Sequence, residues 1–403
     1  MPKSIRKNNP PFDRATSKRD DDVSILIAGD LYPGGKPEKL LIDCKTEKLW
    51  PGVAREASDH DLCIVNLECP LTNSNTPMPK SGPHLRADPR CAEGIKGGGF
   101  HLVTLANNHI LDMGEQGLTD TLSACHTAGI ETVGAGRTLT EATAIKYLKI
   151  KELNIAIINV AENEFSIATN TSAGAWPLDL IENYRQIQEA KAKADFILVI
   201  LHGGNEYYPL PSPQMQNTCR FFAEVGADSV VCHHSHVPSG IECYNGVPIF
   251  YSTGNFLFDW PTRRPPGWYS GYMVSLIVCK HEAVRTKLLP YWQCKDDTGV
   301  HRMNEIEEAA FLDDIKRLSR IIAEESALTQ AWEKFCEERR LYYLSSALSL
   351  TRIERKLLKM GLWPFWRLRR QGLRILLNLV RCESHNDVLI KVLNEKNIES
   401  VKK

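Results

Sequence analysis

Five apolar, strand-like runs in this chain end on residues that can bind a divalent metal ion. The carboxyl ends of neighbouring strands in an α/β protein meet at one edge of a sheet, where such proteins place their chemistry. The residue types are Asp, Glu, Asn and His without Cys, and this mixture of imidazole and oxygen suits Mn, Fe or Zn, with a two-metal hydrolytic centre as a natural use. The runs are ILIAGD with Asp30, LCIVNLE with Glu68, HLVTLANNH with Asn107, Asn108 and His109, FILVILHGG with His202, and SVVCHHSHV with His233, His234 and His236.

The pattern of apolar residues divides the chain into three regions. Residues 1–22 are polar and charged and are predicted to form a disordered N-terminal arm. In residues 23–300 short apolar runs alternate with helical patterns, which predicts an α/β domain. Residues 301–403 are predicted to form a helical, basic C-terminal extension. Within the α/β domain we predict helices at 113–129, 177–194 and 213–225, and strands at 23–29, 61–67, 101–105, 154–160, 196–201, 229–232, 247–252 and 271–279.

Composition bears on partners and location. The 49 Lys and Arg residues balance 49 Asp and Glu residues, so no specific binding of nucleic acid is expected. The 12 cysteines contain no C-x-x-C pair and lie mostly in apolar runs, which indicates free thiols in a reducing compartment. The N-terminal arm lacks the apolar core of a secretory signal, and no stretch approaches the ~20 apolar residues of a membrane-spanning helix. We therefore expect a cytoplasmic protein.

The C-terminal extension contains a strongly basic region. Between Arg352 and Arg381 there are nine Lys or Arg residues and one acidic residue, Glu354. Aromatic residues lie in the middle, where Pro364 predicts a break between two helices. A basic helix with an apolar face can lie on an anionic membrane surface, here the inner membrane face. Two other interpretations stay open: the apolar face packs on the α/β domain, or the region binds a protein or polyanion partner.

The segment ANNHILDMG, residues 106–114, lies where a predicted strand passes into a predicted helix. An amide oxygen, as in Asn107 or Asn108, is a neutral metal ligand, and His109 beside it can act as a general acid or stabilise charge on a leaving oxygen. Asp112 can orient the imidazole, as carboxylates behind metal-site histidines do. The alternative is helix capping by Asn108 or Asp112, but capping needs only one of these residues.

The histidine-rich segment favours metal binding over packing. His234 and His236 are two residues apart, so in an extended chain they face one site together, and His233 precedes them directly. His202 follows a fully apolar strand, and Glu206 is a candidate partner that would orient it. A lone histidine at such a position is commonly a hydrogen-bonded strand-end residue, which is the alternative for His202.

Carboxylates and amides at other strand ends complete the candidate set. Asp30 can bind a hard metal directly, with an Asx-turn or helix cap as the alternative. Asn66 and Glu68 are two apart and face the same side of a strand, so Glu68 could bridge two metal ions; an ordinary surface glutamate is the alternative. Asn255 or Asp259, in YSTGNFLFD, could support the site, although a Gly-Asn pair is also an ordinary turn.

Taken in order, the motifs resemble the CapA family, which is associated with poly-γ-glutamate capsule synthesis and belongs to the calcineurin-like metallophosphoesterase superfamily. The motifs are GDLYPGG, NLECPLT, GFHLVTLANNHILDMGEQGLTDTL, VGAG, HGGNEY, HHSHVP and YSTGNFLFD, and they cover roughly residues 23–280. The resemblance implies a four-layer αββα sandwich with two divalent metal ions at the strand ends. It also implies a catalytic role for His109 and metal ligands at Asp30, Glu68, Asn108, His202, His234 and His236.

The chain departs from the superfamily pattern in several places. The usual Asp-x-His is Asp30-Leu-Tyr here, and the bridging carboxylate is Glu68 instead of Asp. Family members usually carry an N-terminal membrane anchor, and because none is recognisable here, the basic C-terminal region is a candidate for peripheral attachment. Arg86, in HLRADP, lies where the family often has an arginine and is a candidate to bind an anionic substrate; a surface ion pair is the alternative.

Two functional hypotheses follow. In the first, a CapA-like hydrolase of capsule biosynthesis uses a metal-bound hydroxide to cleave a phosphoester or a γ-glutamyl or related amide, while His109 assists at the leaving group. In the second, the chain is a non-catalytic capsule-assembly or polyanion-binding component with the same fold. A hydrolase should lose turnover on His109→Ala and keep its metal, whereas an assembly component should tolerate the change.

Overall fold

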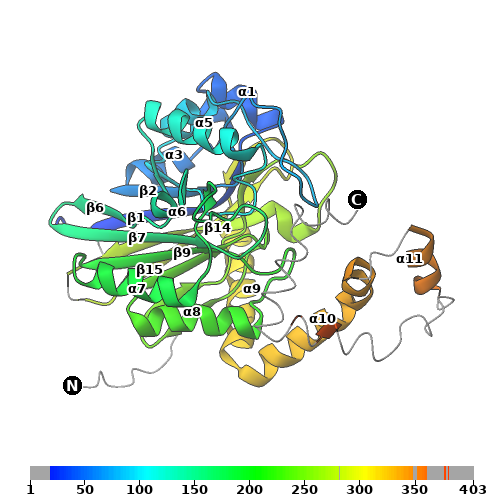
Figure 1. Ribbon diagram of the computed structural model, residues 1–403. Coiled ribbons are helices and arrows are strands. Elements are labelled where there is room, and N and C mark those ends of the chain that lie inside the picture. Colours follow the sequence, from blue (N-terminus) through cyan, green and yellow to red (C-terminus); the bar gives the residue numbers. More distant parts are fainter. Residues whose placement is uncertain (1–18, 281, 348–351, 361–375, 378–379, 381–403) are drawn as a thin grey trace. The chain divides into compact units, whose positions relative to one another are not determined.

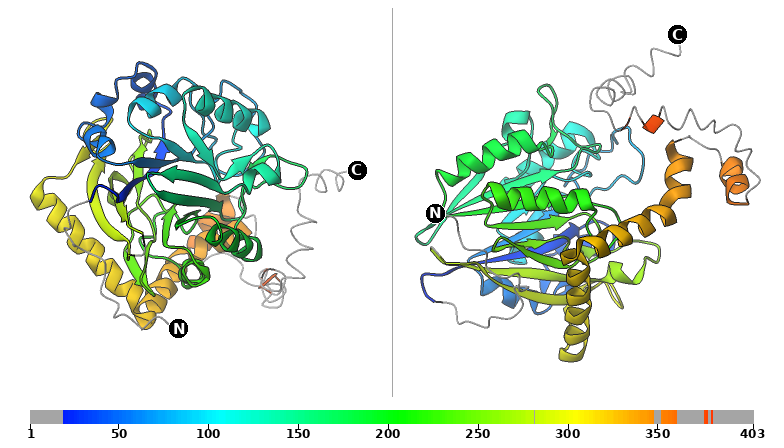
Figure 2. Two further views of the ribbon diagram at one scale, coloured as in Figure 1. Left: turned by 90° about the vertical axis from the view of Figure 1, so that its left-hand side faces the viewer. Right: turned by 90° about the horizontal axis from the view of Figure 1, so that it is seen from below.

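The computed structural model describes residues 19–280, 282–347, 352–360, 376–377 and 380. The chain divides into a compact unit that ends at Trp332 and a second unit, Glu333–Lys403. In the first unit two β-sheets pack face to face, and helices lie along their outer faces (Figures 1 and 2). The four-layer αββα sandwich expected from the sequence is therefore confirmed.

The first sheet is built around β1, which lies between β14 and β2. Strands β1 to β4 run parallel, and β13 also pairs in parallel with the end of β1. The side chains of β2 and nearly all of β1 are buried on both faces, which is why these strands are apolar without alternation. In spatial order the sheet contains β16 (Val300–Arg302), β15 (Arg285–Gln293), β14 (Ser270–Val278), β1 (Val23–Tyr32), β2 (Leu62–Leu67), β3 (Leu102–Thr104) and β4 (Glu131–Val133), with β13 (Asn255–Phe258) beside β1.

The second sheet has a parallel centre and antiparallel edges. Strands β7, β9, β10 and β12 run parallel, and β6 and β11 pair antiparallel at the two edges. In spatial order it contains β11 (Ile241–Tyr244), β12 (Val247–Phe250), β10 (Ser229–His233), β9 (Phe196–His202), β7 (Leu153–Ala161) and β6 (Lys146–Ile150), while β5 (Ala135–Gly136) and β8 (Gly174–Ala175) form a separate pair.

Helices cover the outer face of each sheet. Those between β1 and β4 lie over the first sheet, and α7 and α8 lie over the second (Figure 1). The helices are α1 (Lys36–Ile42), α2 (Thr46–Leu49), α3 (Val53–Ser58), α4 (Cys91–Gly97), α5 (Gly114–Thr127), α6 (Leu139–Ala142), α7 (Leu180–Lys191), α8 (Pro213–Val225), the 3-10 helix η1 (Pro266–Tyr269), α9 (Glu305–Ala323), α10 (Glu325–Ala347) and α11 (Arg352–Lys359).

The eight predicted strands correspond to β1, β2, β3, β7, β9, β10, β12 and β14, and α5 and α8 were also predicted correctly. The predicted start of α7 at Pro177 is wrong. Pro177 is in an extended segment that pairs with Ala161, and the helix begins after Asp179, whose side chain accepts hydrogen bonds from the backbone of Ile181 and Glu182. A side-chain cap therefore defines this helix start, in preference to the proline.

The ends of the α/β domain differ from the predicted boundaries. Asp22 is buried and pairs with Arg285, so the last residues of the predicted arm pack on the domain; residues 1–18 lie outside the described residues. Helix α9, which begins with a capping box of Asn304 and Glu307, lies in the first unit and contacts β11 and β15, although we assigned residues 301 onward to a separate extension.

The basic region Arg352–Arg381 lies largely outside the described residues. Helix α11 is described, and its Arg352, Arg355 and Lys356 are exposed. Contact of this region with a membrane or a partner stays a prediction. Within the described part of the chain, none of the helices combines the length and the apolar character needed to cross a membrane.

Candidate metal centre

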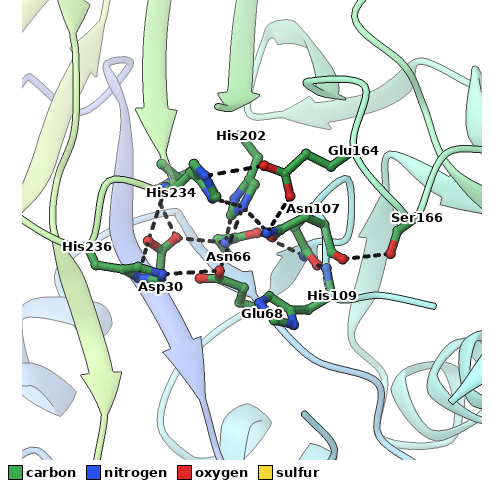
Figure 3. Close-up of polar contacts among 12 residues, drawn as sticks. Asp30, Asn66, Glu68, Asn107, His109, Glu164, Ser166, His202, His234 and His236 are labelled. Atoms are coloured by element: carbon green, nitrogen blue, oxygen red, sulfur yellow. Dashed lines mark hydrogen bonds and ion pairs between the residues drawn. The ribbon is translucent and has the colours of Figure 1, made fainter. Parts of the chain in front are cut away.

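The strand ends of both sheets meet at one site (Figure 3). At the end of β1, Asp30 lies beside Asn66 of β2 and Asn255 of β13. In the second sheet, His202 at the end of β9 pairs in register with His233 at the end of β10. Parallel pairing brings these carboxyl ends together, so the sheets contribute carboxylates and histidines to the same place.

Two groups of potential ligands share one carboxylate. Asp30, Glu68 and His236 form one group, and Glu68, His202 and His234 form the other; in each, the ligating atoms lie within 4.8 Å of one another. The Nε2 atoms of His202 and His236 are each 3.7 Å from Oε1 of Glu68. Nδ1 of His234 is 3.1 Å from Nε2 of His202. Glu68 therefore lies where it could bridge two ions.

Glu68 provides the test of whether a metal fits. Its side chain is fully buried, and neither carboxylate oxygen has a hydrogen-bond partner among the described residues. A buried carboxylate without a partner is costly and is normally paired with a cation. Burial, together with the charge of Asp30, raises the pKa of Glu68 well above its usual value. The arrangement of Glu68 therefore fits bound cations.

The electrostatics of the histidines also fit a metal centre. Burial lowers the pKa of His236 to about 3, with the charge of His234 as the next cause. Burial and the neighbouring histidines hold the pKa of His202 well below its usual value. The imidazoles of His202 and His236 are therefore neutral at pH 7, which is the form that binds metal. Burial raises the pKa of Asp30 to about 6.

Asn66 connects the two ligand groups. Its Nδ2 donates to Oδ1 of Asp30 at 2.7 Å and lies 3.2 Å from Nδ1 of His202. Its Oδ1 accepts from Thr104 at 3.2 Å and from Asn107 at 3.4 Å. Asn66 can thus orient one ligand in each group, as hydrogen-bonding residues behind metal ligands commonly do.

The two asparagines of the 106–114 segment have different positions. Asn107 holds the loop: its Nδ2 donates to the Leu67 carbonyl at 2.8 Å, and its Oδ1 accepts from the His109 backbone at 3.1 Å. Asn108 directs Oδ1 toward Nε2 of His202, at 3.1 Å, and donates Nδ2 to Glu164 at 3.0 Å. The Asn108 oxygen is therefore available to the group that contains His202.

His109 is held by a buried ion pair. Its Nδ1 lies 2.7 Å from Oδ2 of Asp112, which also accepts from the Leu85 backbone at 2.6 Å. Lys80 pairs with the other oxygen of Asp112, and its Nζ lies 3.1 Å from Nδ1 of His109. Burial lowers the pKa of His109; the bond to Asp112 opposes this shift, and the charge of Lys80 adds to it.

Two further residues support the histidine loop. Nδ1 of His236 lies 2.9 Å from Oδ1 of Asn255, which leaves Nε2 to face Glu68. His233 lies outside both ligand groups: its Nδ1 is 3.2 Å from the Thr253 hydroxyl, and burial lowers its pKa to about 3. Asn255 thus contacts the candidate ligand His236, and its support of a metal site stays a prediction.

Three sequence candidates belong to neither ligand group. Arg86 is exposed and donates to the Ser74 carbonyl at 2.7 Å. Asp259 pairs with Lys36 at 3.3 Å. Glu206 is exposed, while His202 is bounded instead by Asn66, Asn108 and His234. Sequence reasoning missed Glu164 and Lys80, because both lie in polar loops without a periodic pattern.

Comparison with known protein families gives a match over most of the α/β domain. The profile described as bacterial capsule synthesis protein PGA_cap matches residues 24–260, which is more than half of the chain. The chain belongs to this CapA family.

Sequence relatives with names from capsule biosynthesis agree with this assignment. The PGA biosynthesis protein CapA of Bacillus subtilis is 34% identical over 252 residues, which cover 61% of this chain and 66% of that protein. The capsule biosynthesis protein CapA of Bacillus anthracis is 28% identical over 251 residues, covering 60% of this chain and 61% of that protein. The chain thus spans slightly less than two thirds of these relatives. The calcineurin-like phosphoesterase YfkN of Bacillus subtilis aligns with a TM-score of 0.40 at 12% identity, covering 75% of this chain and 99% of that one.

Proposed function

We propose that this protein is a metal-dependent hydrolase of capsule biosynthesis that cleaves a phosphoester or a γ-glutamyl or related amide in an anionic substrate. The relatives named for PGA and capsule biosynthesis support the biological role. The observation that carries the chemistry is Glu68, a buried carboxylate without a hydrogen-bond partner between two groups of ligands.

The residues suggest how two ions of Mn, Fe or Zn would be held. One group, Asp30, Glu68 and His236, would hold one ion, and Glu68, His202 and His234 would hold the other. The Asn108 oxygen lies beside the second group. Divalent ions in such a centre would lower the pKa of bound water toward neutral pH and stabilise negative charge on a substrate oxygen.

His109 is the residue best suited to move a proton. Asp112 accepts a hydrogen bond from Nδ1 of its ring, and this bond fixes the ring tautomer and leaves Nε2 for the substrate. Lys80 compensates the buried charge of Asp112, so the carboxylate stays an acceptor. In the neutral ring Nε2 of His109 is an acceptor that can take a proton from the attacking water; the resulting imidazolium, which Asp112 stabilises, can then pass that proton to the leaving oxygen or nitrogen.

The test compares metal content with turnover in three proteins: the wild type, His109→Ala and the double variant His234→Ala/His236→Ala. Metal is measured by elemental mass spectrometry after preparation with Mn and Zn. Turnover is measured with p-nitrophenyl phosphate, bis-p-nitrophenyl phosphate and γ-glutamyl-p-nitroanilide. We expect about two ions per wild-type chain. The double variant should lose metal and turnover together, and His109→Ala should keep metal and lose turnover.

Other outcomes lead to different conclusions. Metal without turnover of any probe, and without an effect of His109→Ala, would favour the non-catalytic capsule-assembly or polyanion-binding component. No bound metal in the wild type would refute the two-ion centre. The probe that is cleaved separates phosphoester from amide chemistry.

A further inference from the structure

Arg264, between β13 and η1, is surrounded by aromatic rings. Its guanidinium carbon lies 4.6 Å from the ring centroid of Trp260, 5.1 Å from that of Trp268 and 6.0 Å from that of Tyr207. Contacts with ring faces stabilise the cation without using its N–H groups, which lie in the plane of the guanidinium. The aromatic residues therefore position Arg264 and leave donors at its edge.

The N–H groups of Arg264 have few acceptors among the described residues. Nη1 donates to the Tyr207 hydroxyl at 3.1 Å, and Nε is buried with no acceptor among the described residues. No carboxylate in the described residues forms an ion pair with Arg264. The other half-buried arginines of the first unit do have such partners: Arg220 pairs with Glu242, Arg285 with Asp22, and Arg302 with Glu56 and Glu308.

A half-buried guanidinium that forms no ion pair with a carboxylate of the described residues is suited to a counter-charge that arrives with a ligand. Arginine is well suited to this task, because its parallel N–H groups match the oxygens of a carboxylate or a phosphate. Arg86, the arginine singled out in the sequence, is less suited: it is exposed, and its Nη1 is bound to the Ser74 carbonyl.

Arg264 shares its aromatic neighbours with a residue of the metal centre. The ring of His236 lies 4.9 Å from that of Trp268 and 6.4 Å from that of Tyr207, measured between centroids. An anion held by Arg264 would therefore lie close to the candidate metal centre.

We propose that Arg264 determines specificity at this centre by binding an oxyanion of the substrate, a carboxylate or a phosphate, beside the bond that is cleaved. The inference rests on the proposed hydrolase function and adds to it the residue that selects an anionic substrate.

The test measures anion binding directly, so that it does not depend on turnover. The Mn²⁺-loaded wild type, Arg264→Met, Arg264→Lys and Arg263→Met are titrated by calorimetry, separately with glutarate and with inorganic phosphate. Arg263→Met is the matched control, because it removes the same charge from the adjacent, exposed position. Metal content and thermal unfolding are recorded for every protein.

We expect Arg264→Met to weaken binding of at least one probe by about 10- to 100-fold, the range of a charge-assisted hydrogen bond. Arg263→Met should bind like the wild type, and Arg264→Lys should fall between the two, because it keeps the charge without the fork of N–H groups. A loss of affinity for glutarate would identify a carboxylate as the group that Arg264 binds, and a loss of affinity for inorganic phosphate would identify a phosphate. If Arg264→Met fails to fold, Arg264→Lys still tests the proposal, which requires a weaker affinity than that of the wild type.

Two outcomes would overturn the proposal. One is equal affinity in the wild type, Arg264→Met and Arg264→Lys, and the other is no binding of either anion by the wild type. Absence of turnover in all proteins, with anion affinity that depends on Arg264, would overturn the hydrolase and leave the anion site standing.

Discussion

Replacing Glu68 by methionine should stabilise the metal-free protein and destabilise the metal-loaded one relative to the wild type. Both carboxylate oxygens of Glu68 are buried without a hydrogen-bond partner among the described residues. An unsatisfied buried polar group costs about 1–3 kcal/mol, and an apolar side chain of similar length removes this cost. The unfolding free energy of Glu68→Met in EDTA should thus exceed that of the wild type by about 1–3 kcal/mol.

Bound metal should make the wild type more stable than Glu68→Met, the reverse of the order in EDTA. A ligand that binds only the folded state at about 1,000 times its Kd adds about 4.1 kcal/mol. Glu68→Met lacks the ligand shared by both groups, so it should gain little from the same metal. The wild type should therefore exceed the variant by about 1–3 kcal/mol with one ion bound, and by about 4 kcal/mol more with a second.

Thermal unfolding of both proteins, in EDTA and with excess Mn²⁺, measures the reversal. For a chain of this length, 1–3 kcal/mol corresponds to a shift in Tm of about 1–4 °C. Glu68→Gln keeps a buried polar group and should gain less than Glu68→Met in EDTA. Glu206→Met, an exposed control, should change little in either condition. A lower Tm for Glu68→Met than for the wild type in EDTA would show that the carboxylate is satisfied without metal, and the metal-fit reasoning would fail.

Three further predictions concern other parts of the molecule. A Cβ on Gly29 would lie 1.9 Å from the Gly254 carbonyl oxygen, so Gly29→Ala should lower the unfolding free energy by about 3 kcal/mol or more. The control Gly97→Ala adds a Cβ in open space and should raise the unfolding free energy or leave it unchanged. Equal stability of Gly29→Ala and the wild type would contradict the close approach of β1 and β13. Burial alone would raise the pKa of Asp22, but hydrogen bonds from Arg19, Cys279 and Arg285 lower it to about 2 from 3.8. This depressed pKa stabilises the fold above pH 3.8, and the effect is lost as the pH falls toward 2. The difference in unfolding free energy between the wild type and Asp22→Asn, measured across an acid titration, should therefore shrink between these pH values. A difference that does not depend on pH would refute the ion pair. Glu164→Ala should weaken metal binding by about 10- to 100-fold, because Glu164 orients the Asn108 amide, and unchanged affinity in a metal titration would exclude that role.

The sequence predicts the buried parallel strands best, because their burial on both faces leaves continuous apolar runs. Strands β13 and β15 were missed for different reasons: β13 is four residues long, and β15 contains Pro290, which disfavours a strand assignment. Asp30, Glu68 and the histidines were recognisable because they end such runs.

Contacts between distant loops could not be predicted in the same way. Lys80 lies in a polar, proline-containing loop, and only the folded chain brings it to Asp112. Arg264 belongs to a similar segment, and its significance depends on rings from Tyr207 and Trp268 that no sequence spacing relates to it. That no carboxylate of the described residues forms an ion pair with Arg264 is visible only in the folded chain.

The candidate ligands come from both sheets: Asp30 lies in β1 and Glu68 follows β2, while His202 ends β9 and His234 follows β10. Bound ions would consequently fasten one half of the sandwich to the other, much as a cross-link does. We expect the sheets to separate more readily when the ions are gone, which exposes the apolar surfaces between them to proteases. The cellular supply of the metal would then set the lifetime of the protein as well as its activity.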